Sequence, residues 1–365
     1  MTQATSASNK AVGNWLLFGV FMLIVQILLG GITRLTGSGL SITEWDVVTG
    51  ALPPLNETQW LQEFNQYKAT PQYRLLNTSF TLGDFKFIFF WEWFHRVWAR
   101  MMGIVFIIGF VYFLAKRYFN KEMIKPMIIL FIIGALQGAV GWIMVASGLT
   151  GDAVYVKPTR LAMHFILAMG LLSYTFWFAL KLKVNQSQIT VHKKTFNFSI
   201  VILALLLLQL MFGALMAGHK AATAAPSWPM INNEWIPKSL FAEKPWLINF
   251  IENKITIHFI HRGLAYLLAL LIFIWYFTTE KAKGSVLFYA TRVIPLALVF
   301  LQIFLGIFTV LTSVRIVPNK WGQFEWIAQL HQLVGMCMLL SFVWVIYLVR
   351  REENKIYSTS TKPAQ

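Results

Sequence analysis

The stretch WEWFHR, residues 91–96, lies near the start of an apolar segment that is long enough to cross a bilayer. It places His95 inside that segment, and a membrane-embedded histidine is costly unless it has a partner or a task. A related stretch, IHFIHR at residues 257–262, places His261 in the same way. Two more histidines, His164 and His331, lie near the starts of other apolar segments. Four histidines placed alike call for a common explanation.

The composition is that of a membrane protein. Hydrophobic residues make up 57% of the 365-residue chain and charged residues only 13%, whereas soluble proteins carry about 25% charged residues. Apolar residues come in runs of about 20, the length that a helix needs to cross the hydrocarbon. The sequence therefore predicts an all-α polytopic membrane protein with eight transmembrane helices. The predicted spans are residues 14–33, 86–115, 124–147, 160–180, 196–217, 255–279, 292–312 and 326–349.

The net charge of +16 first suggests a nucleic-acid partner, but the placement of the charges indicates membrane topology instead. The connecting segments 116–123, 181–195 and 280–291 are short and basic, whereas segments 34–85 and 218–254 are long and of mixed charge. Basic loops are retained in the cytoplasm, so both termini are predicted to be cytoplasmic. We expect no nucleic acid among the partners.

Two further features of the sequence limit the class of protein. The N-terminus lacks a basic n-region and an Arg-rich presequence, so the first apolar run is predicted to be a retained span. The single cysteine, Cys337, excludes a disulfide framework, a cysteine zinc site and an iron–sulfur cluster within the chain.

The predicted topology also places the four histidines. The spans that hold them all run from outside to inside, and each histidine lies within the first few turns of its span. All four are therefore predicted at similar depth in the outer half of the membrane.

The chain contains an internal repeat. HRVWA at 95–99 pairs with HRGLA at 261–265, and LQGAVG at 136–141 pairs with LQIFLG at 301–306; VQILLG at 25–30 likewise pairs with LQLMFG at 208–213. Because this order is kept over four spans, we predict two four-helix bundles, residues 1–183 and 184–365, related by a pseudo-two-fold axis along the membrane normal. The glycines beside the repeated glutamines are expected to permit close helix packing. A cofactor contact is the alternative role of those glutamines, Gln26, Gln137, Gln209 and Gln302.

The histidines suit heme iron. Neutral imidazole is a good axial ligand, and two imidazoles fill both axial positions. The second and fourth helices of each half can face each other across a bundle, so we pair His95 with His164 and His261 with His331. The sequence thus favours two hemes, each held by two histidines. The alternatives are hydrogen-bonded membrane histidines or a proton or metal-ion pathway, which account less well for the matched placement.

The two halves differ beside the first histidine of each pair. Glu92 precedes His95 by three residues and shares its helix face, whereas His258 stands at the equivalent place in the second half. If Glu92 faces the heme, only the first heme has an acid–base group beside it, as expected when one heme reacts and the other relays electrons. A salt bridge of Glu92 with Arg96 or Arg100 is an alternative that is compatible with this role.

Several other side chains are secondary candidates. Arg96 and Arg262 are candidates for pairing heme propionates, since arginine suits carboxylates well. His258 lies one turn before His261 and could compete with it as a ligand, but His261 carries the shared arginine and is preferred. His219, at the outer end of its span, could approach a heme edge, although an interfacial role is favoured.

These motifs resemble those of the heme A synthase family, in its mitochondrial-type bacterial branch, and the resemblance spans nearly the whole chain. The residues that carry it are GITRLTGSGLS at 31–41, Trp45 with Pro53-Pro54, Glu92 through Arg96, Gln137-Gly138, Gly141-Trp142 with Met144-Val145, Ser147-Gly148-Leu149, Arg160-Leu161-Ala162 with His164, His261-Arg262 and His331.

The resemblance implies a fold of two four-helix halves and an oxidoreductase that converts heme O into heme A, the cofactor of terminal cytochrome oxidases. A ring methyl group becomes a formyl group through successive hydroxylations. The resemblance further implies heme b as the cofactor, held by His261 and His331 as an electron relay. It assigns the substrate heme to His95 and His164, and the essential glutamate of the family to Glu92.

The same resemblance implies a multi-pass protein of the bacterial cytoplasmic membrane, in contact with lipid. A heme O synthase is the expected source of the substrate, and an electron acceptor is required; the sequence leaves open which acceptor serves and whether the chain forms a homo-oligomer. Some relatives carry a cysteine pair in the first outer loop, but residues 34–85 have none, so no thiol-dependent step is expected.

Two other functions compete with this one. A diheme cytochrome b that only passes electrons fits the composition and the histidine placement equally well. Glu92 and the long segment 34–85, which could cover a bulky substrate, favour the enzyme. A transporter would need a polar central pathway with broken helices, and the spans hold too few charges for that.

Overall fold

Eight membrane-length helices form the protein, as predicted. The structure, a computed structural model, describes residues 3–44, 52–280, 284–317 and 321–350. The eight helices are α1 (Gln3–Leu35), α4 (Leu82–Ala115), α5 (Lys121–Ala146), α6 (Pro158–Lys183), α7 (Lys193–Gly218), α8 (Lys254–Thr279), α9 (Val286–Thr312) and α10 (Gln323–Leu348). Trp45 and the tail 351–365, which the sequence analysis included, lie outside the described residues.

Several helices begin earlier than their apolar runs because polar caps extend them. Helix α4 starts at Leu82, where Thr81 and Asp84 form a capping box. Asn120 caps α5 and Ser285 caps α9, each through its side-chain oxygen. The predicted starts at residues 86, 124 and 292 were therefore a few residues late. Hydropathy reports the part of a helix that crosses the hydrocarbon, whereas the capping residue sets where the helix begins.

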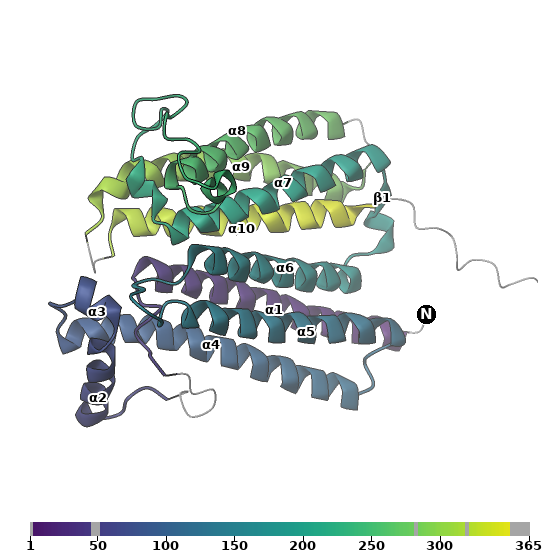
Figure 1. The fold of residues 1–365 in the computed structure, drawn as a ribbon. Coiled ribbons are helices and arrows are strands. Elements are labelled where there is room, and N and C mark those ends of the chain that lie inside the picture. Colours follow the sequence, from purple (N-terminus) through teal and green to yellow (C-terminus); the bar gives the residue numbers. More distant parts are fainter. Residues whose placement is uncertain (1–2, 45–51, 281–283, 318–320, 351–365) are drawn as a thin grey trace, which may run out of the picture.

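The helices fall into two groups that follow the chain (Figure 1). Helices α1, α4, α5 and α6 form one group, and α7 to α10 form the other. Helix α6 packs against α7 and α10, while α1 also contacts α10, so these helices make the junction between the groups. The division at residues 183 and 184 and the two-fold relation between the halves stay predictions.

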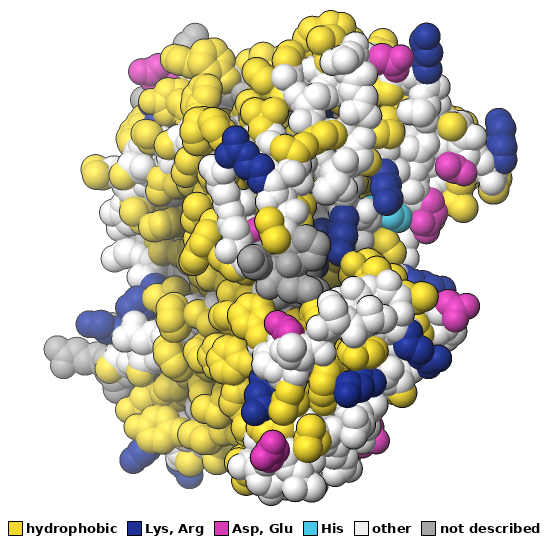
Figure 2. Space-filling view, turned by 90° about the vertical axis from the view of Figure 1, so that its left-hand side faces the viewer, with side chains coloured by type: hydrophobic (Ala, Val, Ile, Leu, Met, Phe, Trp, Pro, Cys, Tyr) yellow, Lys and Arg dark blue, Asp and Glu magenta, His cyan; other side chains and the backbone are white. Residues whose placement is uncertain are grey.

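The centre of the molecule is apolar and rich in aromatic side chains. Trp275 of α8 is fully buried against Phe342 of α10, with ring centres 5.5 Å apart, and its indole N–H donates to Ser199 Oγ at 2.9 Å. Seen from the end with the long loops, hydrophobic side chains cover one flank of both groups, while charged side chains gather on the loops (Figure 2). That distribution fits helices surrounded by lipid.

Two additional helices, α2 (Glu57–Lys68) and α3 (Pro71–Leu76), sit at the long-loop end over the first group (Figure 1). Tyr67 and Phe64 of α2 bury their rings against Phe85 of α4. The Tyr67 hydroxyl donates to Gln72 Oε1 at 3.0 Å and accepts from Asn77 Nδ2 at 2.7 Å. Burial raises the pKa of Tyr67 to about 12, so the hydroxyl keeps its proton and the cap is insensitive to pH in the neutral range.

At the opposite end, a two-residue parallel strand pair joins the loop between the groups to the end of α10. Strand β1 (Thr190–Val191) pairs with β2 (Val349–Arg350). The start of α1 lies at this same end (Figure 1), which agrees with an even number of spans.

The junction between α1 and α10 has no room for a side chain at Gly31. Gln329 Nε2 donates to the Leu28 carbonyl at 3.2 Å, and Gln332 Nε2 donates to the Ile27 carbonyl at 3.0 Å. A Cβ atom at Gly31 would lie 2.5 Å from Gln329 Oε1 and 2.7 Å from Gln332 Oε1.

Replacement of Gly31 by alanine is therefore expected to push both amides away from the α1 carbonyls. We expect the free energy of unfolding to fall by about 1–3 kcal/mol, the usual cost of overpacking, measured by SDS titration of the detergent-solubilised protein. The matched control is Gly103→Ala in α4, because a Cβ there meets nothing within 4 Å. Equal stability of the two variants would contradict the prediction.

Candidate heme-binding site

In the second group, His261 of α8 and His331 of α10 face each other. The ring centres of His261 and His331 lie 6.4 Å apart, with the ring planes at 74°. One iron between two imidazole nitrogens, with bonds of about 2 Å, would separate the ring centres by about 6 Å. The Nδ1 atoms of both rings are buried without a hydrogen-bond partner. The pair thus has the spacing and the free nitrogens that heme iron requires.

The histidines of the first group, His95 of α4 and His164 of α6, belong to one helix group. Their rings rest on glycines of neighbouring helices, Gly30 of α1 and Gly141 of α5. The pairing of His95 with His164 stays a prediction.

Glu92 lies beside the first pair, but its carboxylate is turned to the segment that follows α1. Oε2 accepts from Ser41 N at 2.7 Å, from Ser41 Oγ at 2.7 Å and from Ile42 N at 3.0 Å. Oε1 accepts from Arg96 Nη2 at 2.6 Å. Only 3% of Glu92 is exposed, and these four donors offset the cost of burying a carboxylate. The predicted ion pair with Arg96 is confirmed, and Ser41 is a partner that the sequence analysis missed.

The residues of segment 31–41 form the turn that brings Ser41 to Glu92. Ser38 N donates to the Thr33 carbonyl at 2.9 Å, and Ser41 N also donates to the Ser38 carbonyl at 3.0 Å. Gly37 has a φ of +69°, a conformation that glycine adopts without strain. The turn folds the chain back over α4, which is how Ser41 meets a carboxylate 51 positions further along.

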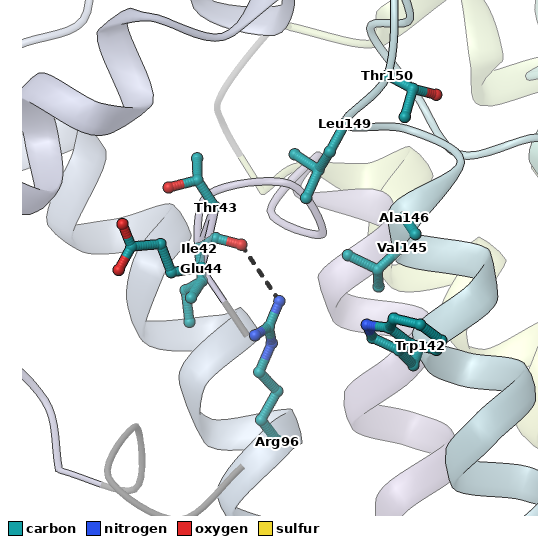
Figure 3. A pocket seen from close by; sticks show the side chains of 9 residues that line it. All are labelled: Ile42, Thr43, Glu44, Arg96, Trp142, Val145, Ala146, Leu149 and Thr150. Carbon is teal, nitrogen blue, oxygen red and sulfur yellow. Dashed lines mark hydrogen bonds between the residues drawn. The ribbon is translucent and has the colours of Figure 1, made fainter. Parts of the chain in front are cut away.

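Arg96 borders a pocket of about 240 Å³ between α4, α5 and the segment after α1 (Figure 3). Its guanidinium donates to the Ile42 carbonyl at 3.3 Å, and the Trp142 indole of α5 stands on the opposite side of the pocket. Val145 and Leu149 add apolar surface. The pocket therefore combines the Arg96 cation and the Glu44 carboxylate with apolar walls, next to the His95 helix.

The second group repeats this arrangement with different chemistry. Arg262 Nε donates to His258 Nε2 at 3.1 Å, so His258 takes the place that Glu92 has beside Arg96. Arg262 also donates to backbone carbonyls of the second long loop, at Ala225, Ser227, Pro229 and Met230. His258 is fully buried and turned to Arg262, which leaves His261 as the residue that faces His331.

The remaining histidines are engaged away from both pairs. His219 Nε2 lies 2.7 Å from the Ile251 carbonyl and 3.8 Å from Glu252 Oε2, at the long-loop end of α7. His192 caps the opposite end of α7 through Thr195. Within the described ranges, no three His, Cys, Asp or Glu side chains cluster as a metal-ion site. Paired histidines, with the other ligands supplied by a porphyrin, remain the arrangement that the residues fit.

The fold and the site together define a class: a polytopic helical membrane protein with two buried histidines in each of two helix groups, of which His261 and His331 face each other. A family model described as cytochrome oxidase assembly protein matches residues 13–352. The chain belongs to this family, and the family predicted from the sequence motifs is thereby confirmed.

Relatives carrying the name heme A synthase cover almost all of the chain. One from Flavobacterium psychrophilum is 38% identical over 344 residues, which cover 93% of this chain and 98% of the relative. One from Cereibacter sphaeroides is 37% identical over 94% of this chain and 88% of its own length. One from Bradyrhizobium diazoefficiens is 39% identical over 92% and 91%, respectively.

Arg262 offers a direct test of how the second loop is held. Arg262→Leu leaves the loop carbonyls and His258 without their donor, and each unpaired buried group costs about 1–3 kcal/mol. We therefore expect the unfolding free energy in detergent to fall by about 2 kcal/mol or more, with faster proteolysis between residues 225 and 230.

The control for this experiment is Arg160→Leu, because Arg160 donates one bond, to the exposed end of α5 at the Ile143 carbonyl. An Arg262→Leu variant as stable and as protease-resistant as Arg160→Leu would show that the guanidinium does not anchor the loop.

Proposed function

We propose that this protein is a heme A synthase, an oxidoreductase that oxidises the ring methyl of heme O to a formyl group by successive hydroxylations. The observation that carries the proposal is the presence of two histidine pairs, of which only one has a carboxylate beside it. The names of the relatives support the same activity. Bound heme b supplies reversible one-electron chemistry.

The residues divide into two sites under this proposal. His261 and His331 hold heme b, and their 6.4 Å ring separation supports an iron shared between them. His95 and His164 hold heme O, the substrate. Bis-imidazole binding in the first site fixes the porphyrin relative to α4, so that a ring methyl is presented to the groups on that helix.

Glu92 is proposed as the catalytic residue of the first site. With water as the oxygen donor, each hydroxylation of a methyl C–H to C–OH releases two protons and two electrons. The electrons leave through the acceptor, and Glu92 is the carboxylate one turn from His95 that is proposed to accept a proton. Its bonds to Ser41 and Ile42 also hold the segment after α1 over this site. Arg96, at the pocket in Figure 3, is proposed to pair with a heme propionate. Arg262 is proposed for the same role at heme b, where a propionate would join or replace its bonds to the second loop.

The surroundings of the protein follow from the same proposal. We place it in the bacterial cytoplasmic membrane with both termini cytoplasmic, on the distribution of basic loops. Its apolar flanks contact lipid, from which a hydrophobic heme O can enter. A heme O synthase is the proposed donor, and a membrane electron acceptor must remove the electrons. Homo-oligomer formation is compatible with the apolar surface.

The activity is tested by expressing the protein in a host that makes heme O and lacks its own heme A synthase. We expect wild type to yield heme A, identified by mass after extraction. Glu92→Gln should lower the yield about 100-fold or more, the usual effect of losing a general acid–base group, with heme O or a hydroxylated intermediate accumulating.

Glu57→Gln is the control, because Glu57 is exposed at the start of α2, on the same outer segment, and is not among the residues that line the pocket beside Arg96. Heme b alone in wild type and in both variants, with bis-histidine spectra intact, would instead identify an electron-transfer diheme cytochrome b.

The assignment of heme b is tested separately by His261→Ala and His331→Ala. Each removes one axial ligand, so the low-spin bis-histidine spectrum of the purified protein should disappear or turn high-spin. His219→Ala and His192→Ala should keep the wild-type spectrum, because these rings bind the Ile251 carbonyl and Thr195. A low-spin spectrum that survives both ligand variants would refute this pairing.

A further inference from the structure

Each of the four paired histidines rests on a glycine of the membrane helix that precedes its own. A Cβ atom at Gly141 would lie closer to the ring than real Cβ atoms come to other heavy atoms, and at the other three glycines it would lie closer than in nine of ten real Cβ contacts, so an added methyl group would displace each ring. The distances from an added Cβ to the imidazole Cε1 are 3.3 Å for Gly30 and His95, 2.8 Å for Gly141 and His164, 3.2 Å for Gly213 and His261, and 3.0 Å for Gly306 and His331.

Each of these glycines follows a glutamine by four positions. A spacing of four places both side chains on one face of the helix, one turn apart. The same Gln-x-x-x-Gly turn therefore occurs in α1, α5, α7 and α9, always against the helix that carries a paired histidine. The glutamines are Gln26, Gln137, Gln209 and Gln302.

Three of the glutamines contact the histidine ring itself. Gln209 Nε2 lies 3.4 Å from His261 Nε2, and Gln302 Nε2 lies 3.4 Å from His331 Nε2. Gln137 Nε2 lies 3.2 Å from Nδ1 and 3.3 Å from Nε2 of His164.

The polar groups around the rings are buried and incompletely paired. The amide oxygens of all four glutamines lack a hydrogen-bond partner, as do the Nδ1 atoms of His261 and His331. Buried polar groups are nearly always paired in native proteins, and a ligating imidazole normally donates its second N–H to an oxygen acceptor. The unpaired amide oxygens thus belong to the glutamines one turn from the glycines on which the rings rest.

Gln26 differs from the other three. Across the part of the chain that the structure describes, no hydrogen bond joins Gln26 to His95, although its amide oxygen is equally buried and unpaired. At His95 the observed element of the turn is therefore the close approach of Gly30, and His95 is the histidine nearest to Glu92 in the sequence.

We propose that the four Gln-x-x-x-Gly turns are imidazole seats that position the heme-ligand histidines. In each seat the glycine sets how closely the ring approaches the neighbouring helix. In three of them the glutamine amide contacts the ring and fixes its plane; at His261 and His331 this contact is to Nε2, and Nδ1 carries no hydrogen bond. These are positioning residues, and the inference rests on the proposed heme ligation.

The seats of the second group are tested through heme b, without reference to enzyme turnover. Gly213→Ala and Gly306→Ala each add a methyl group at the imidazole Cε1. We expect the heme content of the purified protein, measured as pyridine hemochrome, to fall about 10-fold or more, with any remaining heme shifted in its low-spin EPR signals and midpoint potential. Alanine is the better helix former, so these changes do not weaken the helices themselves.

The matched control is Gly263→Ala, on the His261 helix, where an added Cβ meets nothing within 4 Å; heme content and EPR signals should match those of wild type. Gln209→Met, which keeps the length of the side chain but removes the amide, should shift the EPR signals and potential, whereas Gln26→Met should leave heme b unchanged. The methionine variants also carry the test if an alanine variant fails to fold.

The outcomes separate this inference from the proposed function. Loss of heme b in His261→Ala, together with wild-type heme content and EPR signals in the Gly213, Gly306 and Gln209 variants, would overturn the seats alone. A wild-type protein without heme, or heme content unaffected in His261→Ala, would overturn the heme assignment and the seats with it.

Discussion

An imidazole inside a membrane has no water to bond and must be held by the protein itself. This constraint governs the packing at both histidine pairs. Each ring needs a small neighbouring residue that lets it approach the next helix, and a polar group that can form a hydrogen bond with its nitrogens. Glycine supplies the space, since a Cβ at Gly141 would lie 2.8 Å from His164. The order in which the helices pack, α1 with α4, α5 with α6, α7 with α8 and α9 with α10, is the order that joins each ring to its glycine.

The long loops depend on the same helices. One turn of α4 bears Glu92 and Arg96, which bind the backbone and side chain of Ser41 and the backbone of Ile42. One turn of α8 bears His258 and Arg262, which hold the carbonyls from Ala225 to Met230. In both groups the arginine that follows the paired histidine directly in the sequence anchors the loop above it, so the position of the loop and the position of the ring are coupled. Glu92 lies beside Arg96 and His258 beside Arg262, so two similarly packed sites differ in the acid–base group next to the arginine.

The sequence was sufficient for the eight spans and for the proximity of His261 and His331, because hydropathy and matched placement report them directly. Helix starts were less predictable, since Thr81, Asn120 and Ser285 extend three helices beyond their apolar runs. Helices α2 and α3 were not predicted, because they cap the end of the first group and carry no apolar run of membrane length. The bond from Ser41 to Glu92 could not be predicted, because it depends on a turn with a positive φ at Gly37. The glutamines and glycines were noticed as repeated residues, but their contact with the rings is visible only once neighbouring helices are placed.

The position of α10 has a consequence for how the protein is made. This helix is the last in the chain and the most buried of the eight, and it contacts α9, α7, α6 and α1. A ribosome delivers it after every other span, while His261 is already in the membrane. Both His95 and His164 are present once α6 has emerged, whereas His331 joins His261 only when α10 has emerged. Biogenesis therefore has a fixed order: the first two histidines can meet while later spans are still being made, and a ribosome stalled before α10 leaves an open membrane bundle with half of its second histidine pair.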